Sequence, residues 1–274
     1  REVKFMLIGE GTSDIQKMII GRSMLNKVPE VTLVFWLIKI MSTTVGETGA
    51  DYLAVHVGLG TSVTGLIMAA LLAAVLAVQL RMGRYVPWVY WLTVVLVSIV
   101  GTQITDALTD KLEISLYVST ALFATALAAT FAIWFAVERT LSIHSIVTTR
   151  RELFYWAAIL FTFALGTAAG DLATEALGLG FNVGVVVFMA LIAGVTAAYA
   201  LGANEVLAFW IAYILTRPLG ASFGDMLSQS RDYGGLGFGT IYTSLAFLAV
   251  IAALVGWLSF ADGSERTPEA SPRA

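Results

Sequence analysis

The sequence predicts an all-α membrane protein of eight transmembrane helices, arranged as four parallel two-helix repeats. Composition supports this class, because the chain is 58 % hydrophobic and only 13 % charged, with a mean hydropathy of +0.83. A soluble domain carries roughly 25 % charged residues. The second observation is an internal repeat, in which one pattern of aromatic, Gly and Asp residues occurs four times. Repeats of this kind dictate the architecture of a chain.

Each copy of the repeat starts with an aromatic residue and a Trp, and has Gly ten residues and Asp fifteen residues after that Trp. The spacing is identical in all copies, so we expect four equivalent structural units. The copies are Phe35-Trp36…Gly46…Asp51, Tyr90-Trp91…Gly101…Asp106, Tyr155-Trp156…Gly166…Asp171 and Phe209-Trp210…Gly220…Asp225.

Eight apolar stretches are close to the ~20 residues that span a bilayer as a helix, or longer. In order they are 31–57, 62–80, 88–108, 114–137, 154–173, 181–201, 206–227 and 238–260. None shows the alternating pattern of a barrel strand, so helices are expected. The predicted repeats are 31–80, 86–137, 152–201 and 206–260. A segment at 1–30 precedes them, and a tail at 261–274 with the composition of a disordered region follows.

Charge predicts the orientation of the repeats. Two spans per repeat place the N-terminus, the inter-repeat loops and the C-terminus on one face of the membrane. The only basic residues in the loops on the opposite face are Lys111 and Arg231. Positive residues stay in the cytoplasm, so both termini are predicted to be cytoplasmic. Segment 1–30 does not resemble a cleavable signal. The shared face holds Arg1, Lys4, Lys17, Arg22, Lys27, Arg81, Arg84, Arg139, Arg150, Arg151, Arg266 and Arg273.

The first span of each repeat is predicted to lie inside the bundle. Its Gly is followed four residues later by a small residue, and such pairs let helices approach closely in lipid. The second spans carry almost no charge, as at 65–80 and 185–201, and are expected to face lipid. We expect the four Trp residues to form an interfacial aromatic belt. The small pairs are Gly46/Ala50, Gly101/Thr105, Gly166/Gly170 and Gly220/Gly224.

A polar line runs along the first span, where Lys39, Thr43, Glu47 and Asp51 follow each other at four-residue steps. Residues at that spacing share one helix face. The line is charged in the first and last repeats and nearly neutral in the other two. This divergence favours a carrier with one asymmetric site over a symmetric pore. The equivalent lines are Val94-Ser98-Thr102-Asp106, Ile159-Phe163-Thr167-Asp171 and Tyr213-Arg217-Ala221-Asp225.

Ionisable residues within a span mark function by default, because they cost at least ~2.5 kcal/mol to insert. The spans hold two basic and five acidic residues, so pairing leaves three acids and favours a positively charged ligand. We therefore predict a carrier-like permease for a cation, such as a divalent metal or a proton-coupled substrate. The predicted binding residues are Glu47, Asp51, Asp106, Asp171 and Asp225, with Lys39, Arg217 and Thr43 as counter-ions or gates and His56 as a candidate metal ligand.

Two other interpretations stay open. Each Asp could simply end its helix among the headgroups, and the basic residues could pair with acids only to fix the packing. The protein would then be a membrane sensor or an assembly protein. Phosphate loops, nucleophile elbows and dinucleotide fingerprints are absent from the sequence, so neither an enzyme nor a cofactor is expected. Cysteine is absent, and a net charge of −3 gives no sign of nucleic-acid binding.

The four-fold pattern, together with 27–30 (KVPE), 46–48 (GET) and 140–146 (TLSIHSI), resembles a family of bacterial inner-membrane proteins. Members of that family consist of four tandem two-helix repeats, each with a characteristic tryptophan. The resemblance covers residues 27 to about 258 and includes all four Trp positions. It implies an inner-membrane protein of eight spans, and it implies no activity.

Overall fold

The computed structural model describes residues 26–51 and 60–265, and the described part is built from helices and loops. Eight long helices follow each other in the order that the repeats predict. Short π-helical turns, η2 (Ala107–Lys111) and η4 (Leu172–Ala176), extend two of them. The long helices are α2 (Leu33–Asp51), α3 (Gly60–Arg81), α4 (Pro87–Asp106), α5 (Leu116–Glu138), α6 (Thr149–Asp171), α7 (Gly180–Ala200), α8 (Glu205–Ser228) and α9 (Thr240–Glu265).

Burial separates inner helices from outer helices, as the sequence predicts. Of the most apolar 18 residues in each helix, 61 % are buried in α4, α6 and α8, against 11 to 22 % in α3, α5, α7 and α9. The face of α2 that carries Phe35, Ile38 and Thr43 is also buried. The first helix of each repeat therefore lies inside the bundle, and the second helix covers it from outside.

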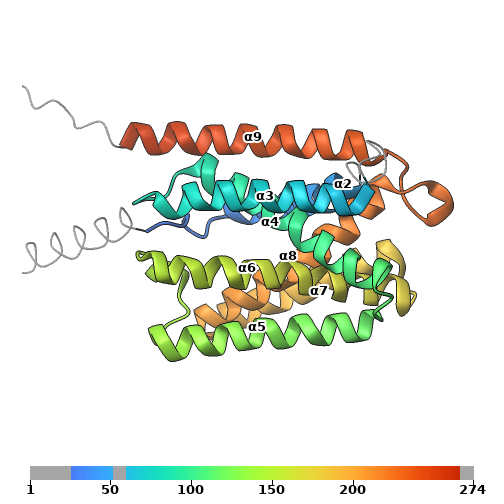
Figure 1. The fold of residues 1–274 in the computed structure, drawn as a ribbon, viewed down its shortest axis with the longest axis horizontal. Coiled ribbons are helices and arrows are strands. Elements are labelled where there is room, and N and C mark those ends of the chain that lie inside the picture. The colour runs from blue at the N-terminus through green and yellow to red at the C-terminus, as the bar shows by residue number, and fades with distance from the viewer. Residues whose placement is uncertain (1–25, 52–59, 266–274) are drawn as a thin grey trace, which may run out of the picture.

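The inner helices form a closed ring in which α2 packs against α4, α4 against α6, α6 against α8, and α8 against α2. Each outer helix packs mainly on the inner helix of the following repeat: α3 on α4, α5 on α6 and α7 on α8. The last outer helix, α9, returns to α2 and completes the cycle (Figure 1). Every repeat thus contributes to the interface of the next one.

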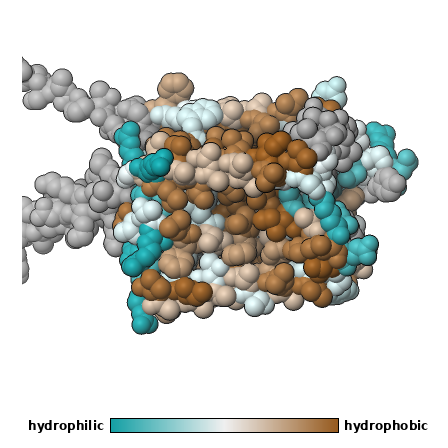
Figure 2. Space-filling view, in the orientation of Figure 1, coloured by the Kyte–Doolittle hydropathy of each residue, from teal (hydrophilic) through white to brown (hydrophobic). Residues whose placement is uncertain are grey.

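The surface fits a membrane. Apolar residues cover the middle of the face shown in Figure 2, and hydrophilic residues gather at the two ends of the helices. Seven described helices, α3 to α9, are long and apolar enough to cross a membrane by length and composition. Within α2, Leu33–Gly46 forms a shorter apolar helix. The chain is a multi-pass membrane protein.

The aromatic-Trp pairs form a ring at one end of the bundle, which we call the Trp end. The residue before each Trp contacts the Trp of the next repeat. The four ring-centroid distances are 5.5 Å for Phe35–Trp91, 5.4 Å for Tyr90–Trp156, 6.2 Å for Tyr155–Trp210 and 5.8 Å for Phe209–Trp36. Equivalent residues therefore lie at one level, which confirms that the repeats run in the same direction.

The expectation of an interfacial aromatic belt is wrong. Trp91, Trp156 and Trp210 are only 2 to 4 % exposed, and Trp36 is half-buried. Their rings are in mutual contact inside the bundle because each one fills the space beside the aromatic residue of the preceding repeat. At this end of the ring they form an aromatic layer across the helices rather than a contact with lipid headgroups.

The repeated glycines give room for one side chain of the next repeat. A Cβ added at Gly46, Gly101 or Gly166 would lie 2.6, 2.7 or 2.5 Å from the Cβ of Ser98, Phe163 or Arg217, respectively. Gly220 of the last repeat would meet Thr43 of the first, again at 2.7 Å. Real Cβ atoms do not approach within 3.0 Å of other heavy atoms. The glycines therefore lie on the seams between inner helices, as predicted.

Candidate functional site

The middle of the inner ring holds two buried basic residues among hydroxyl and aromatic side chains. We call this group the axial cluster, and all of its members are fully buried. They come from all four inner helices and belong to the polar line that the sequence predicts or to its equivalents. The members are Lys39 of α2, Thr102 of α4, Phe163 and Thr167 of α6, and Tyr213 and Arg217 of α8.

Arg217 joins three inner helices. Its Nη2 donates to Thr102 Oγ1 of α4, and it donates to Thr167 Oγ1 of α6 at 2.7 Å. The aliphatic stem of Arg217 lies against Gly166, where a larger residue would displace it. Thr102 and Thr167 occupy equivalent positions in successive repeats, so one guanidinium uses two equivalent partners. The glycine on α6 is thus what admits the guanidinium to the ring.

Lys39 lies nearby, packed against aromatic rings. Its Nζ is 4.0 Å from the ring centroid of Phe163 and 4.3 Å from that of Tyr213, so both rings make cation–π contacts with it. Among the residues that the structure describes, the Lys39 ammonium has no hydrogen-bond partner. The hypothesis that Lys39 or Arg217 pairs with an acid of the spans stays open, because the side chains of Glu47 and Asp51 are not described and Arg217 makes further interactions. The described neighbours of this amine are aromatic rings.

Three of the predicted acids lie toward the C-terminal ends of inner helices. Asp106, Asp171 and Asp225 are half-buried in the last two turns of α4, α6 and α8 or at their ends, and each makes interactions with its surroundings. They mark the end of the bundle opposite the Trp end, which we call the Asp end. After Asp106 and Asp171 the chain enters the π-helical turns η2 and η4, a feature common at functional sites.

Three predicted site residues fall partly or wholly outside the described residues. Glu47 and Asp51 lie on the described backbone of α2, but their side chains are not described, and His56 lies in segment 52–59. Within 26–51 and 60–265, no group of three His, Cys, Asp or Glu residues could hold a metal ion. Thr43 is buried, and its Oγ1 donates to Thr216 O at 3.5 Å across the α2–α8 seam.

Sequence reasoning missed a buried ion pair at the Trp end. Lys27 Nζ lies 2.9 Å from Glu152 Oε2, with side-chain exposures of 7 % and 0 %. Gln79 Nε2 donates to the other carboxylate oxygen at 2.9 Å, and Lys27 N donates to Ile146 O at 3.0 Å. Lys27 had been assigned to the exposed cytoplasmic face. The sequence did contain a hint of this contact, because Lys27 and Ile146 belong to the two loop motifs that carry the family resemblance.

Removing the Glu152 carboxylate should destabilise the fold strongly. Glu152→Ala leaves the Lys27 ammonium buried without its counter-ion, which typically costs about 3–5 kcal/mol. Thermal unfolding in detergent should show a much lower midpoint than for the parent chain. The double variant Lys27→Met/Glu152→Leu should recover most of this loss, since it removes both charges. A control, Asp110→Ala, changes an exposed acid and should leave the midpoint close to the parent value.

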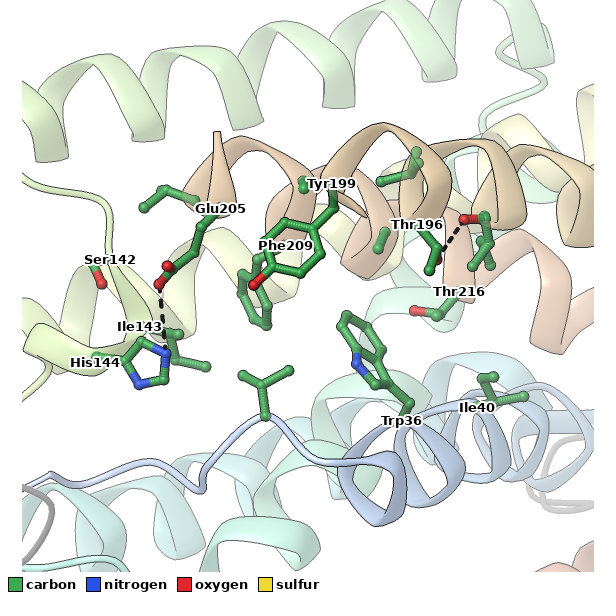
Figure 3. A pocket seen from close by; sticks show the side chains of 16 residues that line it. Trp36, Ile40, Ser142, Ile143, His144, Thr196, Tyr199, Glu205, Phe209 and Thr216 are labelled. Carbon is green, nitrogen blue, oxygen red and sulfur yellow. Dashed lines mark hydrogen bonds and ion pairs between the residues drawn. The ribbon is translucent and has the colours of Figure 1, made fainter. Parts of the chain in front are cut away.

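A cavity of about 510 Å³ opens beside α8, between α2 and α7. Trp36 projects into it from α2, with Tyr199 and Phe209 on the opposite side (Figure 3). His144 and Glu205 lie at one end, with His144 Nε2 3.8 Å from Glu205 Oε1. Ile40 and Thr216 lie at the other end. Each of these two is the chain neighbour of a basic residue of the axial cluster, Lys39 or Arg217.

A known repeat family matches the whole bundle. The family described as Repeat of Unknown Function (DUF347) matches residues 34–85, 89–140, 154–202 and 208–264. The chain belongs to this family. Each DUF347 match starts two residues before a Trp of the aromatic ring and covers one inner and one outer helix. The family repeat is therefore the structural repeat. No curated protein and no solved structure matches the chain.

Proposed function

We propose that the protein is a carrier-like permease of the bacterial inner membrane, with both termini in the cytoplasm. Its substrate is a cation, and a divalent metal or a proton-coupled substrate fits the same charges. It is not an enzyme and uses no cofactor. The proposal draws on the closed ring of inner helices, whose middle is polar and charged although the bundle is surrounded by apolar surface.

The observation that carries the proposal is the burial of Lys39. A residue that serves only the fold has no need of a fully buried lysine amine without a hydrogen-bond partner, because burying this group costs free energy whether it is charged or neutral. Among the described residues, Lys39 is in that position. The two aromatic rings beside it return only about 0.5–2 kcal/mol each. The remaining cost is understandable if the ammonium is needed for transport.

The same geometry favours a carrier over an open channel. Lys39 and Arg217 lie within the ring, and a cation that crossed the membrane through the centre of the ring would meet both basic residues. The aromatic layer at the Trp end fills the space between the inner helices at that level. A substrate can pass such barriers only if helices rearrange, which is how carriers operate.

The Asp end supplies the negative charge for a cation. Asp106, Asp171 and Asp225 lie half-buried on three inner helices at the same end. The repeat places Asp51 at the equivalent position and Glu47 one turn before it. In this mechanism the acids collect the cation at the Asp end, and Lys39 and Arg217 act as gates deeper in the ring.

The second candidate function is a membrane sensor or assembly protein, and one observation favours it. The Arg217 guanidinium links α4, α6 and α8 by hydrogen bonds to Thr102 and Thr167, as a packing residue would. In that case the charges serve the fold alone, and no cation should cross the membrane.

Flux measurements in reconstituted vesicles test the proposal. The parent chain should move protons or a divalent cation across the bilayer, followed with a pH- or metal-sensitive dye inside the vesicles. Glu47→Gln and Asp51→Asn should abolish this flux while thermal unfolding stays close to that of the parent. The control Asp110→Asn removes an exposed acid outside the polar line and should keep full flux. Equal flux in the parent, the double variant and empty vesicles would rule out transport by these acids.

A further inference from the structure

The cavity beside α8 is lined by a position of the repeat that differs in all four copies. Forty-three residues after the Trp, the outer helices carry Gln79, Trp134, Tyr199 and Ala253, respectively. Gln79 is fully buried and binds Glu152 of α6, while Trp134 is fully buried and lies 5.9 Å from Trp210 of α8. Tyr199 is 54 % exposed. The junction that Gln79 and Trp134 fill in their repeats is hollow where Tyr199 stands.

The walls of this cavity suit an apolar ligand with an aromatic or aliphatic body. Its volume of about 510 Å³ lies in the range of small-molecule sites, about 300–1,000 Å³. Val31, Ile40, Ile192 and Val195 line it, and they offer no hydrogen bonds from their side chains. The hydroxyl groups of Ser142, Thr196 and Thr216 also line it, but those of Thr196 and Thr216 already donate to carbonyl oxygens of their own helices. A strongly polar or hydrated ligand would therefore recover little of its lost hydration here.

The open end of the cavity suits a positive charge. Glu205 is the acid among the described lining residues, and none of those residues is Lys or Arg. The indole of Trp36 and the rings of Tyr199 and Phe209 project into the same space (Figure 3). Aromatic faces near a carboxylate recognise ammonium groups through cation–π and charge interactions. His144 Nε2 lies 3.8 Å from Glu205 Oε1, an ion-pair distance when the imidazole is protonated, and the Glu205 side chain is 64 % exposed, so it stays accessible to a ligand.

The inner end fixes the orientation of such a ligand. Ile40 and Thr216 line that end, and they are the chain neighbours of Lys39 and Arg217. Two positive charges lie close behind the inner wall, so a cationic group is repelled from it. The ammonium group would therefore stay near Glu205, and the apolar body would point inward.

We propose that this cavity is a binding site for lipophilic organic cations, meaning ammonium compounds with an aromatic or aliphatic body. This inference rests on the proposed transport of a cation and names a substrate class for it. The site lies beside the axial cluster, at the end of the ring that the aromatic layer closes. A ligand bound there would reach the inner helices from the side of the bundle between α2 and α7.

Calorimetric titration of the purified full chain in lipid nanodiscs tests the site. The probe is benzyltrimethylammonium, and its neutral isostere neopentylbenzene differs only by carbon in place of charged nitrogen. The parent chain should bind the ammonium compound at least about fivefold more tightly, as expected for a cation–π and carboxylate site. Glu205→Gln and Trp36→Leu should each weaken ammonium binding about fivefold or more. Asp110→Asn, a charge-matched control at the Asp end, should leave it unchanged.

A filling variant gives an independent check. Ala212 lines the cavity, so Ala212→Trp should place an indole in the hollow junction, much as Trp134 does in the preceding repeat. Probe binding should disappear while the unfolding midpoint is kept. If Ala212→Trp does not fold, Glu205→Gln still decides the matter, because Glu205 is mostly exposed and its loss does not disturb packing.

Other outcomes separate the site from the transport proposal. Equal binding of the ammonium compound and its neutral isostere would mean that the cavity is an apolar site for lipid chains, and the inference would be overturned. Flux of inorganic cations without any ammonium binding would overturn the inference and leave the transport proposal standing. Ammonium binding that depends on Glu205, but with no flux of any cation, would support the site and overturn transport.

Discussion

Gly220→Leu is expected to destabilise the bundle by about 3 kcal/mol or more, because it forces apart the α8–α2 seam that closes the ring. Even a Cβ at this position would lie 2.7 Å from Thr43 Cβ and 3.1 Å from the Ile40 carbonyl oxygen. Overpacking a well-packed site typically costs about 1–3 kcal/mol, and leucine adds three further carbon atoms. Thr44 Oγ1 also donates to Gly220 O at 3.0 Å, a bond that depends on the close approach. Thermal unfolding in detergent measures the loss.

Two variants complete this experiment. Gly166→Leu should lower the unfolding midpoint by a similar amount, because its side chain would collide with the stem of Arg217. Ala198→Leu lies on the exposed surface of the outer helix α7 and should change the midpoint little. If all three variants lose the same stability, the inner seams are no tighter than the lipid-facing surface.

Lys39→Met should keep or raise the stability of the fold while abolishing cation flux. Pairing with an acid, the sequence-based expectation, would have made this variant costly, since breaking a buried ion pair typically loses about 3–5 kcal/mol. The contacts of the described residues lead us to expect the opposite sign. Among the described residues no hydrogen bond is lost, and a thioether packs well between the rings of Phe163 and Tyr213.

Arg217→Met is the matched comparison within the axial cluster. It removes the hydrogen bonds to Thr102 and Thr167, two buried hydroxyl groups that the guanidinium links. It should therefore lower the unfolding midpoint, in contrast to Lys39→Met. Unfolding and vesicle flux are measured on both variants. A Lys39→Met chain that unfolds at a much lower temperature, or that transports like the parent, would show that Lys39 serves the fold alone.

The spacing of the repeat predicted most of the architecture. Because the interval between Trp and Gly is constant, the glycines lie at the same height in the four inner helices. Each can then contact the neighbouring inner helix in the same way, as Gly101 contacts Phe163 and Gly220 contacts Thr43. The inner position of these helices could also be predicted, because small residues on a helix face favour close packing in lipid. The burial of the Trp rings could not, since amphipathic aromatic residues suit both the interface and a protein interior.

The candidate site was predicted only in part. The polar line of the first repeat includes Lys39 and its equivalent in the last repeat includes Arg217, and both side chains are buried within the ring. Their partners depend on contacts between repeats, and nothing local in the sequence shows that Lys39 meets Phe163. The pair of Lys27 with Glu152 joins residues 125 positions apart, and the side cavity depends on how far Tyr199 reaches. Both are properties of tertiary packing.

The packing of α9 against α2 determines the order in which the helix interfaces can form during synthesis. Interfaces between consecutive repeats can form as each repeat is synthesised, whereas α2 gains α8 and α9 only when the last repeat is in place. Until then the face of α2 that bears Lys39 and Thr43 lacks its final neighbours, and joining it to α8 closes a loop of more than 150 residues. The entropy cost of closure grows only slowly with loop length. Late closure is thus thermodynamically cheap, but it exposes an unfinished polar surface to the lipid for most of the time that the chain is being made.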